Sequence, residues 1–201
     1  MGTNLDYDDH RPARTLEVCV DNVDGLSAAI AGGADRIELC DALELGGLTP
    51  TAGLLHIGAA SPLPVVARIR PRGGDFCFDG VEIQLMLNEI DAVAAIGLQG
   101  VVLGASLRNG ELDRQTLERL VRRARSHGLE CALHRAIDLC PDQARATRLA
   151  IELGFARILT SGGAGRAARA GLLAALLRRP LTFIPANHSL RCAPSHRQGD
   201  N

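Results

Sequence analysis

Two cysteines stand near the ends of neighbouring apolar runs, Cys19 in LEVCV and Cys40 in RIELC. If these runs are adjacent strands, the two side chains share a face, and neighbouring strands lie about 4.8 Å apart. Two thiolates at that spacing could hold a soft cation such as Cu(I) in a two-coordinate site. Buried free cysteine is also a common small core residue, so the pair alone leaves both interpretations open. No CxxC or paired Cys/His spacing indicates structural zinc.

Polar residues recur on one face of the apolar runs that the sequence predicts as strands. Side chains alternate along a strand, so Glu17 shares the face of Cys19, and Glu38 shares the face of Cys40. The same parity adds three further polar side chains, namely Arg68, Arg70 and His134. Burying so many charges is costly unless they are paired or line a wet pocket. A satisfied Glu–Arg network is one interpretation, and a polar pocket at the carboxyl ends of the strands is the one we favour.

A loop rich in proline and glycine follows the third apolar run, in RIRPRGGDFCFD. Arg70 and Arg72 flank a glycine pair whose backbone could approach an anion closely. Arg68, on the same strand face as Arg70, would add a third guanidinium. The same segment could equally be a rigid surface loop with Asp75 capping the turn.

Two further segments end predicted strands with residues suited to chemistry. LHRAID contains His134, a candidate general base or metal ligand, and Asp138, which could orient it; a hydrogen-bonded core histidine and a turn cap are the alternatives. ILTSGGAGR leads from a strand into a helix, and free N–H groups at a glycine-rich helix start bind phosphate or carboxylate. The residues concerned are Thr160, Ser161, Gly162 and Gly163. A plain glycine turn without a ligand has the same pattern.

These residues are spaced along a repeating pattern of short apolar runs and longer stretches with helical spacing. The predicted strands are 16–20, 36–40, 65–70, 100–104, 130–134 and 157–160. The predicted helices are 23–31, 51–59, 81–96, 113–127, 142–153 and 166–177. Six βα units in this order fit an open doubly wound sheet or a barrel, and the polar inner face favours a TIM-type (β/α)8 barrel.

Length and composition narrow the function further. The 201 residues suffice for one domain but are few for a closed (β/α)8 barrel, which typically has about 250. A net charge of -1 and an aromatic content of 2% argue against nucleic acid as a partner. All 22 basic residues are arginine, so an enzyme that forms a Schiff base with its own lysine is excluded.

The sequence also predicts where the protein resides. No run approaches the ~20 apolar residues of a membrane-spanning helix, so we expect no membrane partner. Residues 1–14 are polar and acidic, unlike a signal peptide, and we predict that they form a disordered N-terminal lead. The six cysteines lie mostly in strand-like runs rather than in a short loop-rich framework, which favours reduced thiols in the cytoplasm.

Four segments together resemble the CutC family, which is named for copper homeostasis. They are LEVCVDNVDGLSAAIAGGADRIELCDALELGGLTPTAGLL, IRPRGGDFCF, LHRAID and ILTSGG. The resemblance runs from about Leu16 to about Leu177, which is most of the chain. It implies a (β/α)8 barrel in the cytoplasm with a role in copper tolerance or trafficking, and copper binding at Cys19 and Cys40.

The end of the sequence departs from that family, whose members continue with a seventh strand, a glycine-rich turn, a helix and an eighth strand. Here the chain continues as RRPLTFIPANHSLRCAPSHRQGDN, in which 181–184 could be a seventh strand and nothing remains for the eighth. We therefore predict an incomplete, C-terminally truncated barrel over 15–180 and a divergent, partly disordered tail over 181–201. Exposed strand edges would favour pairing with another chain, as in a homodimer.

Three functional hypotheses follow. The first is a copper-homeostasis protein that binds Cu(I) through Cys19 and Cys40. The second is a barrel enzyme acting on a small anionic or phosphorylated metabolite, without a nucleotide cofactor. Its anion would be bound by the three arginines, and the backbone of 161–163 would supply further donors. Glu17 or Glu38, together with His134, would transfer protons in this enzyme. The third is an inactive remnant of the family.

Overall fold

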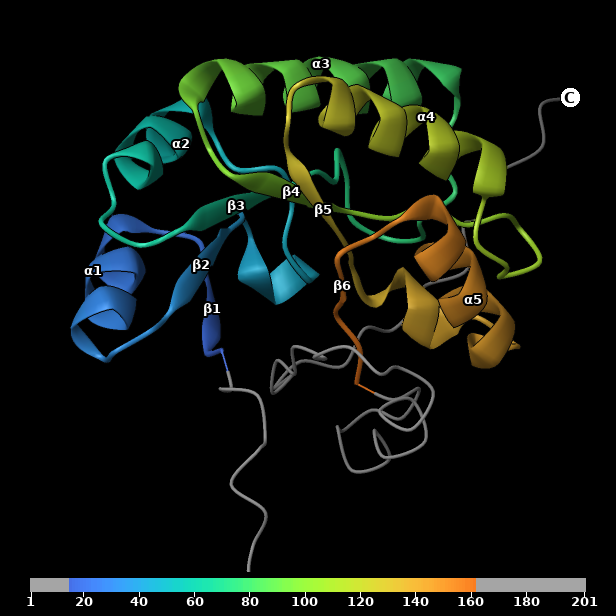
Figure 1. The fold of residues 1–201 in the computed structure, drawn as a ribbon, viewed down its shortest axis with the longest axis horizontal. Helices are drawn as coiled ribbons and strands as arrows, with labels where there is room; N and C mark the ends of the chain where they lie inside the picture. Colours follow the sequence, from blue (N-terminus) through green and yellow to red (C-terminus); the bar gives the residue numbers. More distant parts are fainter. Residues whose placement is uncertain (1–14, 162–201) are drawn as a thin grey trace, which may run out of the picture.

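A computed structural model of the chain describes residues 15–161, in which six strands alternate with helices (Figure 1). The strands are β1 (Glu17–Val20), β2 (Arg36–Leu39), β3 (Val65–Arg68), β4 (Gly100–Leu103), β5 (Glu130–Leu133) and β6 (Arg157–Ile158). The α-helices are α1 (Val23–Ala31), α2 (Ala52–Ala59), α3 (Gly80–Ile96), α4 (Arg114–Ser126) and α5 (Gln143–Leu153). Two 3-10 helices that the sequence analysis did not predict, η1 (Leu43–Leu45) and η2 (Arg135–Leu139), follow β2 and β5.

The sheet is parallel throughout, and its strand order follows the sequence from β1 to β6. Figure 1 shows the sheet curling, with the α-helices arranged around its outer side. A doubly wound sheet would instead reverse its strand order and carry helices on both faces. The predicted (β/α)8-type barrel, incomplete over the described range, is therefore confirmed for six βα units as far as β6. The predicted helix 166–177, the seventh strand at 181–184, the N-terminal lead and the C-terminal tail lie outside the described residues.

Each α-helix begins after a side chain that accepts a hydrogen bond from the N–H groups of its first turn. These N-cap residues are Asn22, Thr51, Asp79, Asp113 and Asp142. At α3, Asp79 and Glu82 bond to each other's backbone in a capping box. We predicted that three of the helices start at Thr51, Asp113 and Asp142, and each starts one residue later because these side chains cap the helix from outside it.

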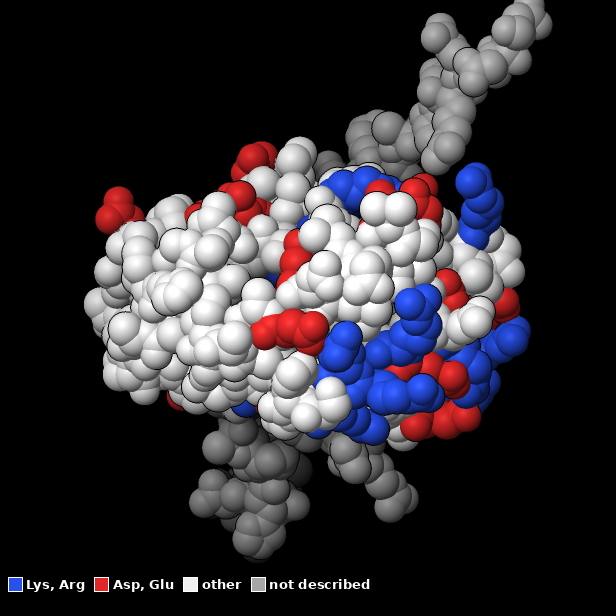
Figure 2. Space-filling view, turned by 90° about the horizontal axis from the view of Figure 1, so that it is seen from above, with Lys and Arg blue, Asp and Glu red and all other residues white. Residues whose placement is uncertain are grey.

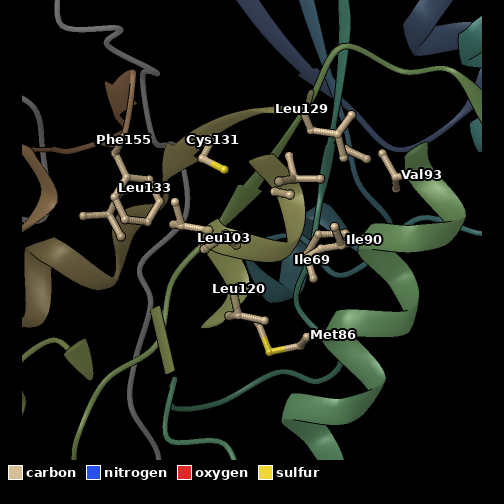
Figure 3. Packing of buried hydrophobic residues seen from close by; sticks show 14 of the residues in the cluster. Ile69, Met86, Ile90, Val93, Leu103, Leu120, Leu129, Cys131, Leu133 and Phe155 are labelled. Carbon is tan, nitrogen blue, oxygen red and sulfur yellow. The ribbon is translucent and has the colours of Figure 1, made fainter. Parts of the chain in front are cut away.

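The main apolar core lies between the outward face of the sheet and the helices. Figure 3 shows side chains of the strands and of helices α3 and α4 in this layer, among them Ile69, Leu103, Leu133, Met86, Ile90 and Leu120. All six are fully buried. A separate, smaller apolar cluster lies on the inward face and consists of Val66, Val102, Ala132 and Leu159. The alternation of side chains along each strand therefore separates an apolar outer layer from an inner face that is only partly apolar.

The charges of the outer surface are unevenly distributed. Figure 2 shows acidic and basic side chains gathered over one part of this face, while the rest is largely uncharged. Charged side chains also pair between neighbouring helices, such as Arg114 of α4 with Glu152 of α5 at 2.6 Å and Arg123 of α4 with Asp91 of α3 at 3.3 Å. Over residues 15–161, no helix is long and apolar enough to cross a membrane.

Candidate functional site

Polar side chains inside the curled sheet form two groups, one near the start of the strands and one near their ends. When the register is followed from strand to strand, the partner of Cys19 on β1 is Val66 on β3 and then Glu130 on β5. Because neighbouring strands of a (β/α)8 barrel are staggered by about one residue each, the residues level with Cys19 are Arg68 and His134. These three residues form a layer toward the carboxyl ends of the strands, which is where barrel sites lie.

The two predicted copper ligands contact each other in this region. In the register of β1 and β2, Cys19 lies opposite Glu38, and Cys40 follows Glu38 by two residues in the chain. The two sulfurs are nevertheless 3.8 Å apart, and Cys40 Sγ also donates to the Val20 carbonyl at 3.5 Å. A disulfide requires about 2.05 Å between sulfurs, and both residues are free thiols. The separation leaves room for one soft ion to bridge the sulfurs once their protons have left.

The surroundings of Cys19 favour its protonated thiol. The pKa of Cys19 lies well above its usual value because of the hydrogen bond with Cys40, burial and the charge of Glu38, partly offset by Arg68. Among residues 15–161 there is no cluster of three or more His, Cys, Asp or Glu side chains that could hold a metal ion. The ligand set that this part of the chain offers is therefore a pair of soft sulfurs, which suits Cu(I) better than zinc.

Arg68 forms a fully buried ion pair beside the cysteines. Its Nε and Nη2 atoms lie 2.8 and 2.5 Å from Glu38 Oε1, and Nη1 donates to the Gly46 carbonyl at 2.9 Å. Burial opposes the charge of Arg68, but Glu38 and the neighbouring thiols outweigh it and raise its pKa. Gly47 has a φ of +83°, and a side chain there would meet Arg68 Cδ at 3.0 Å. The guanidinium thus connects β2 to the loop that follows it.

Arg70 and Arg72 also bind parts of the protein. Arg70 is 1% exposed and donates to the carbonyls of Leu45, Gly47 and Gly74 at 3.0, 3.3 and 2.9 Å. Arg72 contacts Glu82 at 2.5 Å, and it also bonds Asp75 and the Cys77 carbonyl. The predicted anion-binding arginines are thus brought near each other, and each orders a loop through protein groups.

His134 is held rigidly at the end of β5. Its side chain is fully buried, and Nδ1 accepts a hydrogen bond from the Ala136 N–H at 3.2 Å. The imidazole lies 4.6 Å from the Phe76 ring and directly against Gly104, where an added Cβ would come within 2.5 Å of Cε1. Burial and the charges of Arg68 and Arg70 lower the pKa of His134 well below its usual value. His134 is therefore a neutral imidazole in the folded protein.

Asp138 does not orient His134; it binds the end of β6 instead. Its carboxylate accepts hydrogen bonds from the Thr160 hydroxyl and from both the N–H and the hydroxyl of Ser161, at 2.5 to 3.1 Å. Arg135 adds an ion pair at 2.9 Å. Burial alone would raise the pKa of Asp138, but these donors lower it. The Ser161 N–H that we predicted as an anion donor thus binds Asp138, and Gly162 and Gly163 lie outside the described residues.

Glu17 belongs to the other group, near the start of the strands. Its fully buried carboxylate lies 3.4 Å from Arg36 and 3.6 Å from Arg157, which also pairs with Glu130. Burial and the charge of Glu38 raise the pKa of Glu17, although Arg157 and Arg36 counteract this. Glu17 and Glu38 thus have different arginine partners, although their charges still act on each other.

Two features of the site were not singled out from the sequence. Gly104 leaves the space that the His134 ring fills, and Phe76 packs against that ring. Gly104 follows the inward-facing Val102 by two residues, so the alternation of side chains along the strand could have placed it inside the barrel beside His134. The position of Phe76 depends on the path of the loop after β3, for which the sequence contains no comparable signal.

Comparison with known proteins places the chain in a family. The CutC family model matches residues 14–179. The chain belongs to the CutC family. A CutC-named protein of Sinorhizobium medicae (strain WSM419) is 57% identical over 155 residues, which cover 77% of this chain and 62% of the relative. One of Caulobacter vibrioides (strain NA1000 / CB15N) is 56% identical over 149 residues, covering 74% and 60%.

The same family supplies a solved structure. The crystal structure of the putative copper homeostasis protein CutC from Streptococcus agalactiae superposes with a TM-score of 0.78 at 28% identity, over 85% of this chain and 87% of that one. The chain spans about three fifths of the length of the curated relatives that it matches. Family membership and the barrel fold are thus shown, and the resemblance seen in the four sequence segments is confirmed.

Proposed function

We propose that this CutC-family chain serves copper homeostasis by binding Cu(I) through Cys19 and Cys40. The observation that carries the proposal is the 3.8 Å separation of two free thiols inside the barrel. Sulfur ligands select soft, monovalent copper over harder ions. The copper named in the description of the Streptococcus agalactiae relative supports the same choice of ion.

Binding at this pair is expected to release protons. Since the pKa of Cys19 is raised, its thiol is protonated near neutral pH and Cu(I) must displace that proton. The affinity should therefore increase as the pH rises. Arg68, which lies close enough to lower the pKa of Cys19, would stabilise the negative charge of a bis-thiolate complex.

An anaerobic competition titration against a Cu(I) chelator tests the proposal. The Cys19→Ser, Cys40→Ser double variant should lose affinity by well over about tenfold, because both soft ligands become hard hydroxyls. The matched control is Cys131→Ser, Cys140→Ser, which changes two buried thiols outside the inner face, both with pKa raised by burial to about 11. Unchanged affinity in the first variant would refute the proposal.

A second function, an enzyme acting on a small anionic or phosphorylated metabolite, is favoured by one observation. Inside the barrel, His134 Nε2 and Glu38 Oε2 are buried without a hydrogen-bond partner among the described residues. Native proteins rarely leave such atoms unsatisfied unless a water or ligand reaches them. An enzyme active at this inner face would use these two groups.

We also propose the cytoplasm as the site of action. The five described cysteines are all free thiols, which persist in a reducing compartment. Labelling with a membrane-impermeant thiol reagent in intact and lysed cells tests this, because a cytoplasmic protein would react only after lysis.

A further inference from the structure

Several buried polar atoms of the inner face have no hydrogen-bond partner within residues 15–161, and two of them concern a possible ligand. They are His134 Nε2 on β5 and Glu38 Oε2 on β2, and both side chains are 0% exposed. A buried polar atom without a hydrogen bond destabilises a fold by about 1–3 kcal/mol. Their presence in an otherwise well-bonded layer therefore indicates that something outside the described chain satisfies them.

The hydrogen bonding of His134 determines whether its Nε2 is a donor or an acceptor. Nδ1 accepts from the Ala136 N–H at 3.2 Å, so the proton of the neutral ring resides on Nε2. Gly104 and Phe76 hold the ring in place on its faces. His134 therefore presents a fixed N–H donor, and it could act as a base only after a change of tautomer.

The direction of this donor follows from the strand. His134 continues the inward parity of Ala132, which belongs to the inner apolar cluster. Nε2 lies at the tip of the ring, on the side away from Cβ, and so faces the barrel interior. The positive charges of Arg68 and Arg70 both act on the imidazole, and Arg68 is in turn paired with Glu38. An oxygen that carries negative charge is the acceptor that this environment favours.

Glu38 has a carboxylate oxygen that requires a hydrogen-bond donor. Its Oε1 binds Arg68, whereas Oε2 is left for a hydrogen-bond donor. β2 and β5 are separated by two strands in the curled sheet, so the two atoms approach the interior from different sides. The apolar cluster of Val66, Val102, Ala132 and Leu159 forms the floor beneath this level and limits the depth of anything bound there.

We infer that His134 Nε2 and Glu38 Oε2 are two contacts of one binding site for a small hydroxycarboxylate. A carboxylate oxygen accepts from His134, and the ligand's hydroxyl donates to Glu38. The inference does not depend on copper binding, because neither sulfur of the Cys19–Cys40 pair is one of its contacts. It replaces the predicted arginine-based anion site with a histidine donor, since the arginines bind protein groups.

Isothermal titration of the full chain with glycolate, acetate and ethylene glycol tests the two contacts together. Glycolate carries both required groups, whereas acetate lacks the hydroxyl and ethylene glycol lacks the carboxylate. We expect glycolate to bind about tenfold or more tighter than either, because each comparison probe leaves one charged or buried partner unsatisfied. Equal binding of glycolate and acetate, or no binding of glycolate, would overturn the inference.

A pair of histidine variants isolates the donor. His134→Asn retains an acceptor near the Nδ1 position but removes the distal N–H, whereas His134→Gln retains a distal N–H donor and loses the acceptor. Glycolate affinity should fall about tenfold or more in His134→Asn and be largely kept in His134→Gln. Equal loss in both variants, with the fold intact by circular dichroism, would contradict a donor role.

Two readouts keep the inference testable if a variant fails to fold. In the unaltered chain, ¹⁵N NMR of the imidazole should show the Nε2–H tautomer, and glycolate should shift Nε2 rather than Nδ1. In the Cys19→Ser, Cys40→Ser variant, glycolate binding should persist within about threefold, which separates this site from the copper proposal. A protonated Nδ1, or Nε2 unchanged by glycolate at saturation, would refute it.

Discussion

The two ends of the barrel interior use the same kinds of residues in different ways. Near the start of the strands, Glu17, Arg36, Glu130 and Arg157 form ion pairs with one another. Near the ends of the strands, Glu38 and Arg68 form one tight pair, while His134 and two thiols lie beside it. The first group balances its charges internally, and the second presents donors and soft ligands toward the interior.

Unpartnered atoms occur at both ends, and their surroundings distinguish them. Glu17 Oε1 and Arg157 Nη2 also lack hydrogen bonds among the described residues, but they belong to side chains of opposite charge 3.6 Å apart. The two opposite charges attract each other even though these atoms form no hydrogen bond. His134 Nε2 has two cations nearby and no acceptor. The unpaired nitrogen of His134 thus belongs to a ring with no opposite charge beside it, whereas the carboxylates of Glu17 and Glu38 are each paired with an arginine.

The largest expected difference between the two ends concerns their carboxylates. Glu38→Ala leaves the buried charge of Arg68 without its partner and should lower the free energy of unfolding by about 3–5 kcal/mol. Glu17→Ala should lower the free energy of unfolding by about 1 kcal/mol, because Arg157 remains paired with Glu130 and Arg36 is partly exposed to solvent. Urea denaturation measures both values, and equal losses would show that the two ends do not differ in this way.

Two glycines, one at the start of β4 and one directly after its end, allow a comparison with an intermediate expected effect. A Cβ at Gly104 would lie 2.5 Å from His134, and one at Gly100 would lie 2.5 Å from the Glu130 carbonyl. Each alanine variant should therefore destabilise the fold by about 1–3 kcal/mol through overpacking. Only Gly104→Ala should alter the imidazole ¹⁵N signals of His134. If Gly100→Ala altered them equally, the two layers would not be independent.

The smallest expected effect is a pH dependence that arises from His134. Its folded pKa is lowered, so below about pH 6.5 the unfolded chain binds a proton that the folded protein does not. The free energy of unfolding should decrease as the pH falls from about 6.5, by at most about 1.4 kcal/mol per pH unit from this residue. His134→Gln should lack this slope when urea unfolding is measured between pH 7 and 5. An identical slope in both proteins would assign the effect elsewhere.

Residue patterns predicted the fold and the composition of the inner face well. Alternation along the strands correctly separated Ile37 and Leu39, which face the helices, from Glu38, which faces inward. The pattern succeeds because a strand has a fixed period of two, whatever its neighbours are. The predicted helix starts were one residue early at Thr51, Asp113 and Asp142, since capping and helical residues adjoin in sequence.

The site was predicted less completely, because its contacts join distant loops. The three arginines were predicted to bind an anion, yet each of them donates to loop carbonyls, and the paths of those loops have no sequence signature. The sequence left open whether Asp138 orients His134 or caps a turn, and in the structure its carboxylate accepts hydrogen bonds from Thr160 and Ser161. Both residues lie in LHRAID, but the 3-10 helix after β5 directs the carboxylate toward β6.

The sequence by itself determined the order of elements, the inward face on which Cys19, Glu38, Arg68 and His134 lie, and the family to which the chain belongs. Those properties depend on local periodicity and on residue identity. Only the tertiary structure decided that two thiols offset in register still meet at 3.8 Å, and that Ala136 binds Nδ1 of His134 and leaves Nε2 as a donor. Such outcomes depend on strand stagger and loop paths, which are set by packing across the whole barrel.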